Sequence, residues 1–141
     1  MLEHQHLIVR AETRLTPRSV TDTLAWFRGL VEAIGMRLID LPHNPNCFYM
    51  NTPGNRGLTC VGIIETSHIA LHCWDEQDPG LFQLDIYSCK AFDPARVVEH
   101  FACFDPVRVE YKFLDRQNGL VELPLPENGV CPGPRANVVT A

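Results

Sequence analysis

The stretch SHIALHCWDEQDPGLFQLDIYSC (residues 67–89) decides the fold, because it encodes two strands and the turn between them. Residues 67–74 and 81–89 alternate apolar and polar side chains, and the turn residues DEQDPG separate them. The second strand has an apolar face and a polar face, which are Phe82, Leu84 and Ile86 against Gln83, Asp85, Tyr87 and Cys89. The stretch therefore predicts an antiparallel hairpin with one face turned to a core.

The first strand has an unusual polar face. Alternation places His68, Ala70, His72 and Trp74 together, opposite Ile69, Leu71 and Cys73. Such a face needs a partner, which is a functional site, a second subunit or both. A hydrogen-bonded polar surface at an interface explains it as simply as a site does.

Two common sites do not fit this strand. His68 and His72 are separated by roughly 13 Å on a strand, at ~3.3 Å per residue, so they cannot both bind one metal ion. No G-x-S-x-G motif surrounds Ser67, and no acid is marked as the partner of a catalytic histidine. We therefore expect neither a metal site nor a serine-hydrolase triad.

Further elements are predicted on both sides of the hairpin. A helix follows Thr16 as cap and Pro17 as first residue and ends at Gly35, with an apolar stripe of Val20, Leu24, Phe27, Val31 and Ile34. Asp93 and Pro94 begin a second helix over 93–104, lined by Val97, Phe101 and Phe104. Strands are expected at 6–12, 36–41, 58–65 and 107–114, with a short one at 47–50.

This order predicts an α+β fold, a two-layer sandwich of a largely antiparallel sheet with two helices on one face. Residues 1–121 are expected to form the domain. Residues 122–141 are rich in proline without periodicity, which predicts an irregular tail.

Composition narrows the function. The 141 residues carry a formal net charge of −5 and no run of basic residues, which argues against nucleic-acid and acidic-membrane partners. No apolar run reaches the roughly 20 residues of a membrane span, and the N-terminus is not typical of a signal peptide. The six cysteines form no C-x-x-C pair, so we expect reduced thiols in a cytoplasmic protein.

The hairpin resembles the prokaryotic S-adenosylmethionine decarboxylases. That family has Glu-Ser-His, then a second His, a Trp-Pro-Glu and later an Asp-x-x-x-Cys. The matching positions here are Ser67, His68, His72, Trp74, Glu76, Asp85 and Cys89. The resemblance extends weakly over residues 4–115.

The resemblance implies a chain that processes itself. The serine hydroxyl attacks the preceding carbonyl, the resulting ester is eliminated, and the serine remnant becomes an N-terminal pyruvoyl group. Its ketone forms a Schiff base with the substrate amine and accepts electrons from the breaking bond to the carboxylate. The product carbanion then needs a proton donor.

Residue roles follow from the same resemblance. Ser67 would be the pyruvoyl precursor, with cleavage between Thr66 and Ser67. His72 would be the processing base, Thr59 would support the cleavage intermediate, and Cys89 would donate the proton. The substrate-binding set implied for an adenine and a ribose is Trp74, Glu76, His68 and an aromatic residue from Phe48 or Tyr49. The family also buries its site between two protomers, which implies a homodimer.

The sequence departs from the family where the substrate would lie. Thr66 replaces a glutamate, Arg10 replaces an acid, and Asp75 replaces a proline. Three functions therefore stay open: decarboxylation of S-adenosylmethionine, decarboxylation of another amino acid such as arginine or ornithine, and a non-cleaving binding or regulatory role.

Overall fold

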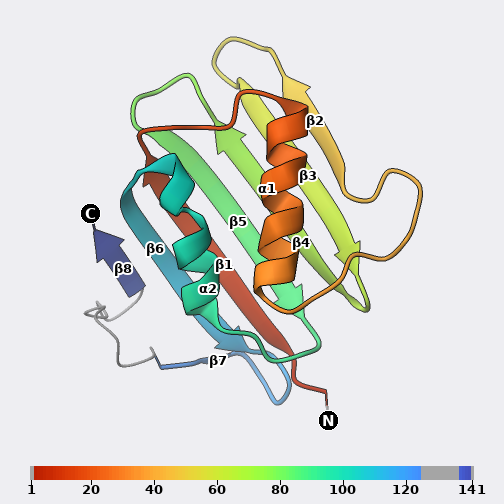
Figure 1. Ribbon diagram of the computed structural model, residues 1–141. Coiled ribbons are helices and arrows are strands. Elements are labelled where there is room, and N and C mark those ends of the chain that lie inside the picture. The colour runs from red at the N-terminus through yellow and green to blue at the C-terminus, as the bar shows by residue number, and fades with distance from the viewer. Residues whose placement is uncertain (1, 125–136, 141) are drawn as a thin grey trace.

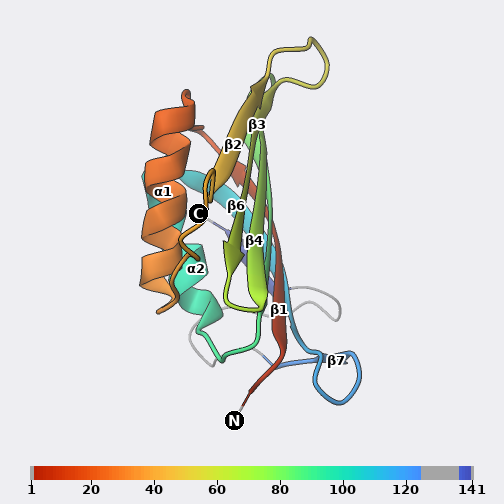
Figure 2. The same ribbon diagram turned by 90° about the vertical axis from the view of Figure 1, so that its right-hand side faces the viewer.

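The protein folds into a single antiparallel sheet with helices on one side, as Figures 1 and 2 show. The computed structural model describes residues 2–124 and 137–140. The elements are β1 (Gln5–Thr13), α1 (Val20–Ala33), β2 (Asn46–Met50), β3 (Gly57–Ile64), β4 (Ser67–Trp74), β5 (Gly80–Ser88), α2 (Pro94–His100), a 3₁₀ turn (Ala102–Phe104), β6 (Pro106–Asp115), β7 (Val121–Glu122) and β8 (Asn137–Thr140).

The sheet runs in the order β2-β3-β4-β5-β1-β6-β7, and β8 also pairs with β6. All of these pairings are antiparallel. In Figure 1, α1 lies over the half of the sheet that contains β3 and β4, and α2 lies over β1 and β6. The predicted α+β sandwich is confirmed, because both helices cover the same face (Figure 2).

The core lies between that face and the helices. Alternate residues of β1, β4 and β5 are buried there, and the apolar set predicted for the hairpin is confirmed by the burial of Ile69, Leu71, Cys73, Phe82, Leu84 and Ile86. Burying each large apolar side chain stabilises the folded state by about 1.5–3 kcal/mol, so this face contributes strongly to the free energy of folding. No helix of the described residues covers the opposite face, which we call the open face.

The first helix begins later than the sequence predicts. Ser19, not Thr16, is the N-cap, and its hydroxyl oxygen accepts a hydrogen bond from the Asp22 amide at 3.0 Å. The buried face shifts accordingly, because Val20 is exposed while Trp26 and Leu30 are buried. The exit at Gly35 is confirmed by its left-handed φ of 72°.

The second helix has the predicted Asp93 cap and buries Val97, Phe101 and Phe104. It ends at His100, and a 3₁₀ turn completes the predicted range. Residues 36–41 are not a strand, since only Leu38 makes a bridge, to Ile64.

The C-terminal part also differs from the prediction. The sequence predicts that residues 107–114 form the last strand. Two further strands, β7 and β8, follow it in the chain, and both pair with β6. An irregular tail is therefore wrong for residues 137–140, which continue the sheet. The rest of the tail after residue 124 lies outside the described residues. No helix in the described ranges is long and apolar enough to cross a membrane.

Candidate active site

The first group of candidate residues lies at the turn between β3 and β4. Ser67 begins β4, is only 7% exposed, and faces Ile64 across a two-residue turn. Cys89 follows the last residue of β5, and its amide donates a hydrogen bond to the Ser67 hydroxyl oxygen at 3.0 Å. The structure therefore brings together the serine and the cysteine that are 22 residues apart in the sequence.

Thr66 completes this group. Its hydroxyl donates to the Cys89 sulfur at 3.0 Å, and the thiol in turn donates to the Glu65 carbonyl at 3.4 Å. Hydrogen bonding to Thr66, followed by that to Ser67, lowers the pKa of the Cys89 thiol. Burial instead raises the pKa of Cys73 to about 12, so the pKa values of the two thiols are shifted in opposite directions. Cys89 is thus the more readily ionised of the two.

The backbone of Thr66 is strained. Its φ is 47°, in the left-handed region that a β-branched residue rarely occupies. Such a conformation costs of order 1–3 kcal/mol and persists only where the surroundings hold it. It lies directly before the peptide bond that would be cleaved. A cavity of about 360 Å³ opens beside this turn, lined by Ser67, Cys89, Glu65, Arg37 and Lys90 among others.

The second group lies on the open face. Thr59 of β3 is the direct partner of His72 of β4, and the Thr59 Oγ1 and His72 Nδ1 atoms are 2.9 Å apart. A cavity of about 250 Å³ adjoins the pair, and Phe48 and Trp74 also line it. The pairing follows from the register, because directly opposite residues of an antiparallel pair share a face.

The structure does not bring these two groups together within one chain. Ser67 and His72 lie five residues apart on one strand, which is about 17 Å at about 3.3 Å per residue. They also lie on opposite faces, since Ser67 is buried and His72 is exposed. One protomer therefore cannot place its own His72 at its own Ser67.

The other candidates are divided between different surroundings. Phe48 is 61% exposed on the open face, whereas the Tyr49 hydroxyl donates to the Asp75 carboxylate at 2.9 Å. Of the two aromatic candidates, Phe48 is the one that lines a cavity together with Trp74.

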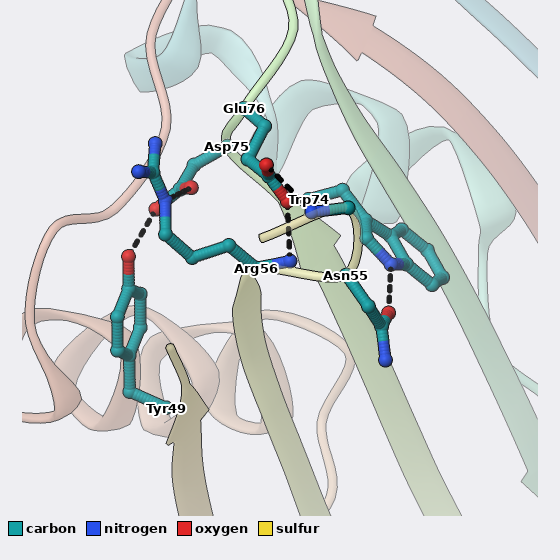
Figure 3. A network of polar contacts seen from close by, with 7 residues as sticks. Tyr49, Asn55, Arg56, Trp74, Asp75 and Glu76 are labelled. Carbon is teal, nitrogen blue, oxygen red and sulfur yellow. Dashed lines mark hydrogen bonds and ion pairs between the residues drawn. The ribbon is translucent and has the colours of Figure 1, made fainter. Parts of the chain in front are cut away.

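The Glu76 carboxylate accepts hydrogen bonds from the amides of Gly54 and Arg56, and these bonds lower its pKa (Figure 3).

Sequence reasoning missed a cluster around Asp85. Its Oδ1 atom lies 2.7 Å from His6 Nε2 and 3.3 Å from His68 Nε2, which joins β1, β4 and β5 on the open face. Arg116 approaches the other nitrogen of His6 at 3.0 Å. The alternation placed Asp85 on the polar face, but only the strand order β4-β5-β1 brings His6 beside it.

Arg10 lies on the same face and pairs with Glu12 at 3.1 Å. It lines a cavity of about 430 Å³ that also includes His72, Asp85, Glu110 and Lys112. Among the described residues, no group of three or more histidine, cysteine, aspartate or glutamate side chains is arranged to hold a metal ion. The five cysteines of this part of the chain are unpaired.

Comparison with known families gives one finding. Residues 18–117, well over half of the chain, match the family model described as S-adenosylmethionine decarboxylase. The matched range includes both the Ser67–Cys89 group and the Thr59–His72 pair.

Proposed function

The chain belongs to the S-adenosylmethionine decarboxylase family, and from that premise we propose that it is a self-processing, pyruvoyl-dependent decarboxylase of S-adenosylmethionine. Its product would be the aminopropyl donor for spermidine synthesis in the cytoplasm. The observation that carries the proposal is the contact of Ser67, Cys89 and Thr66 at the β3–β4 turn.

The residues at this turn fit a pyruvoyl group derived from Ser67. The serine is held by the Cys89 amide in a buried position beside a cavity, so its remnant would meet substrate away from bulk water. Such a group supplies the electron sink for loss of the carboxylate. Cys89, one hydrogen bond away, would deliver the proton to the decarboxylated carbon, and the lowered pKa of its thiol supports this role.

The Thr59–His72 pair would act on the partner's Ser67. This arrangement follows from the distance within one chain and supports a homodimer with the site shared between protomers. The open face suits a second copy, because Ile8, Phe48, Met50, Val61 and Ile63 are 41% to 61% exposed on it. Exposed apolar side chains in such number favour an interface over contact with water.

The cavity that Phe48 and Trp74 line would hold the planar ring of the substrate. Two aromatic side chains at a cavity of about 250 Å³ suit an adenine, which binds by stacking. His72 lies at the same cavity, with its ring centroid 6.0 Å from that of Trp74. Ring binding and the Thr59–His72 pair would therefore be supplied by the same protomer.

Intact mass spectrometry tests the proposal. We expect purified protein to yield two chains, residues 1–66 and 67–141, and only the larger one to react with a carbonyl reagent such as a hydrazide. Ser67→Ala is the matched control and should remain one chain, because no hydroxyl attacks the Thr66 carbonyl. A single intact mass for the natural sequence after long incubation, with no hydrazide adduct, would exclude both pyruvoyl-dependent functions.

One observation favours the non-cleaving alternative as the second candidate. The attacked carbonyl belongs to Thr66, a β-branched residue whose hydroxyl is already bonded to Cys89. A binding or regulatory relative would keep this turn intact. The same mass measurement separates the two functions.

A further inference from the structure

Processing would remove two of the contacts that hold the start of β4. The cut between Thr66 and Ser67 opens the β3–β4 turn, so the residue derived from Ser67 becomes a chain end. The serine oxygen leaves as part of the new Thr66 carboxylate, and the serine nitrogen leaves as ammonia when water supplies the ketone oxygen. The Cys89 amide, which donates to the Ser67 hydroxyl at 3.0 Å, then loses that acceptor. A chain end of this kind is disordered unless other contacts hold it.

Backbone pairing at this end of β4 is incomplete. Ser67 lies opposite Ile64 of β3, but the pairing of β4 with β5 begins one residue later, with His68 opposite Tyr87. His68 is therefore the first residue behind the cut that has a paired strand on both sides. Segments with few partners open most readily. The side-chain contacts of His68 should thus decide how firmly the cut end stays in place.

A carboxylate on β5 holds His68. Asp85 Oδ1 lies 3.3 Å from His68 Nε2 and 2.7 Å from His6 Nε2. Both imidazoles are diagonal neighbours of Asp85, whose direct partners in the register are Ala70 of β4 and Ile8 of β1. Diagonal neighbours on one face are within reach of long and aromatic side chains. One carboxylate oxygen thus joins the three adjacent strands β4, β5 and β1 (Figure 1).

The proton positions at His6 follow from its partners. Arg116 approaches His6 Nδ1 at 3.0 Å, and a guanidinium can only donate, so Nδ1 accepts. The proton of the neutral ring is then on Nε2, which donates to Asp85. The His6 side chain is only 17% exposed and belongs to β1, which pairs with a strand on each side. Asp85 is therefore fixed from the middle of the sheet, and it holds the more exposed His68 side chain in turn.

We propose that Asp85 is a positioning residue, which through His68 keeps the Ser67-derived end of β4 in place after the chain is cut. The inference rests on the proposed function, because the β3–β4 turn already holds this end in the uncut chain. The cut itself does not require Asp85, since it occurs while the turn is intact. Decarboxylation does, because displacing a reacting group by about 1 Å can lower a rate by a factor of about a hundred.

Amide hydrogen exchange over residues 68–71 tests the proposal in full-length protein before and after the cut. Asp85→Ala removes the acceptor, and Asp85→Asn retains an oxygen at this position. In cleaved protein we expect Asp85→Ala to speed exchange on the order of tenfold and Asp85→Asn to stay near the natural rate. In the uncut Ser67→Ala background, Asp85→Ala should change exchange by less than about twofold. Equal acceleration in both backgrounds would overturn the proposal, because it would identify an ordinary sheet contact.

Tyr87→Phe is the matched control. Tyr87 lies on the same face of β5, its hydroxyl is 2.6 Å from His4 Nδ1, and its ring stacks on that of His68 with the centroids 5.9 Å apart. The substitution removes a hydrogen bond and keeps the ring, so exchange over residues 68–71 should stay at the natural rate in both backgrounds. A change as large as that in Asp85→Ala would mean that any lost bond on this face loosens β4, and it would contradict the role of Asp85.

Steady-state kinetics of the cleaved variants give the second readout. The two Asp85 variants should cleave fully and show the natural carbonyl content by hydrazide labelling, because the turn is intact when the cut occurs. We expect Asp85→Ala to lower kcat about tenfold and to change KM by less than about twofold, since the proposed ring site is at the cavity of Phe48 and Trp74. Asp85→Asn should restore kcat. A natural kcat in fully labelled Asp85→Ala would show that Asp85 positions nothing that the reaction needs.

Failure of the proposed function is recognised separately. If the natural sequence is not cut, its intact mass shows this, and the pyruvoyl-dependent function fails. The role of Asp85 is then measured in a Ser67→Ala chain that carries a protease site between residues 66 and 67 and is cut after purification. Faster exchange in Asp85→Ala only after this cut supports the positioning role. If Asp85→Ala speeds exchange no more in the cut chain than in the uncut one, the positioning role is wrong.

Discussion

At the residue scale, Thr66 is the most informative position. Its φ of 47° is strained for a β-branched side chain, and its hydroxyl is bonded to the Cys89 sulfur. Asn or Gly would occupy this backbone conformation more easily. The threonine that does occupy it donates a hydrogen bond from its hydroxyl to the Cys89 sulfur, and this bond lowers the pKa of the thiol.

The Thr66 hydroxyl should control the acidity of Cys89. Thr66→Val keeps the shape and removes the donor, so we expect the thiol pKa to rise and the thiolate fraction at a given pH to fall. Thr66→Ser retains the donor and should stay near the natural value. The measurement is the pH dependence of iodoacetamide alkylation at Cys89, by peptide mass mapping in a Ser67→Ala background that remains one chain. Equal alkylation midpoints for the Val and Ser variants would show that the hydroxyl has no effect.

At the element scale, the caps determine where the helices begin. Thr16 and Ser19 both precede a plausible first turn, and Pro17 favoured the earlier start. The structure places the cap at Ser19, where the side chain meets the Asp22 amide. The helix therefore begins at Val20, three residues after the predicted start at Pro17.

Ser19→Ala should destabilise the folded protein by about 1 kcal/mol, the usual effect of losing an N-cap hydrogen bond. Thr16→Val removes the hydroxyl of the competing cap without changing its shape, and its free energy of unfolding should stay within about 0.5 kcal/mol. Urea unfolding in the Ser67→Ala background measures both. A larger loss for Thr16→Val than for Ser19→Ala would contradict the cap assignment.

At the scale of the whole molecule, the two halves of the candidate site lie apart. Ser67 and Cys89 form one group, and Thr59 and His72 form the other on the open face. Neither group has both the proposed cleavage site and the proposed processing base. We expect a second copy to join them by bringing its own Thr59–His72 pair to the β3–β4 turn of the first.

Co-expression of two inactive variants tests this arrangement. A His72→Ala chain keeps Ser67, and a Ser67→Ala chain keeps His72, so a shared site in a mixed dimer restores one complete pair. We expect the His72→Ala chain to be cleaved when both are present, with each variant alone remaining intact, as read from intact masses. Cleavage of neither chain in isolated mixed dimers, while the natural sequence cleaves, would mean that His72 serves its own protomer.

What the sequence by itself determined is local. Alternation along β4 and β5 separated core residues from the polar face, and the Asp93-Pro94 start located α2. These features depend on neighbours within a few residues, because strand period and helix capping are properties of the chain over short distances. The residue types of the hairpin also carried the family resemblance, which the family match supports.

Only the tertiary structure decided which residues meet. The register of β3 on β4 paired Thr59 with His72, and the strand order placed His6 against Asp85. The tertiary structure also turns the Glu76 carboxylate toward the loop before β3, where it accepts a hydrogen bond from the Arg56 amide. Register and strand order are set by contacts between segments far apart in the sequence, so no local pattern specifies them. The distance between Ser67 and His72, and with it the expectation of a shared site, could be recognised only once their strand and faces were known.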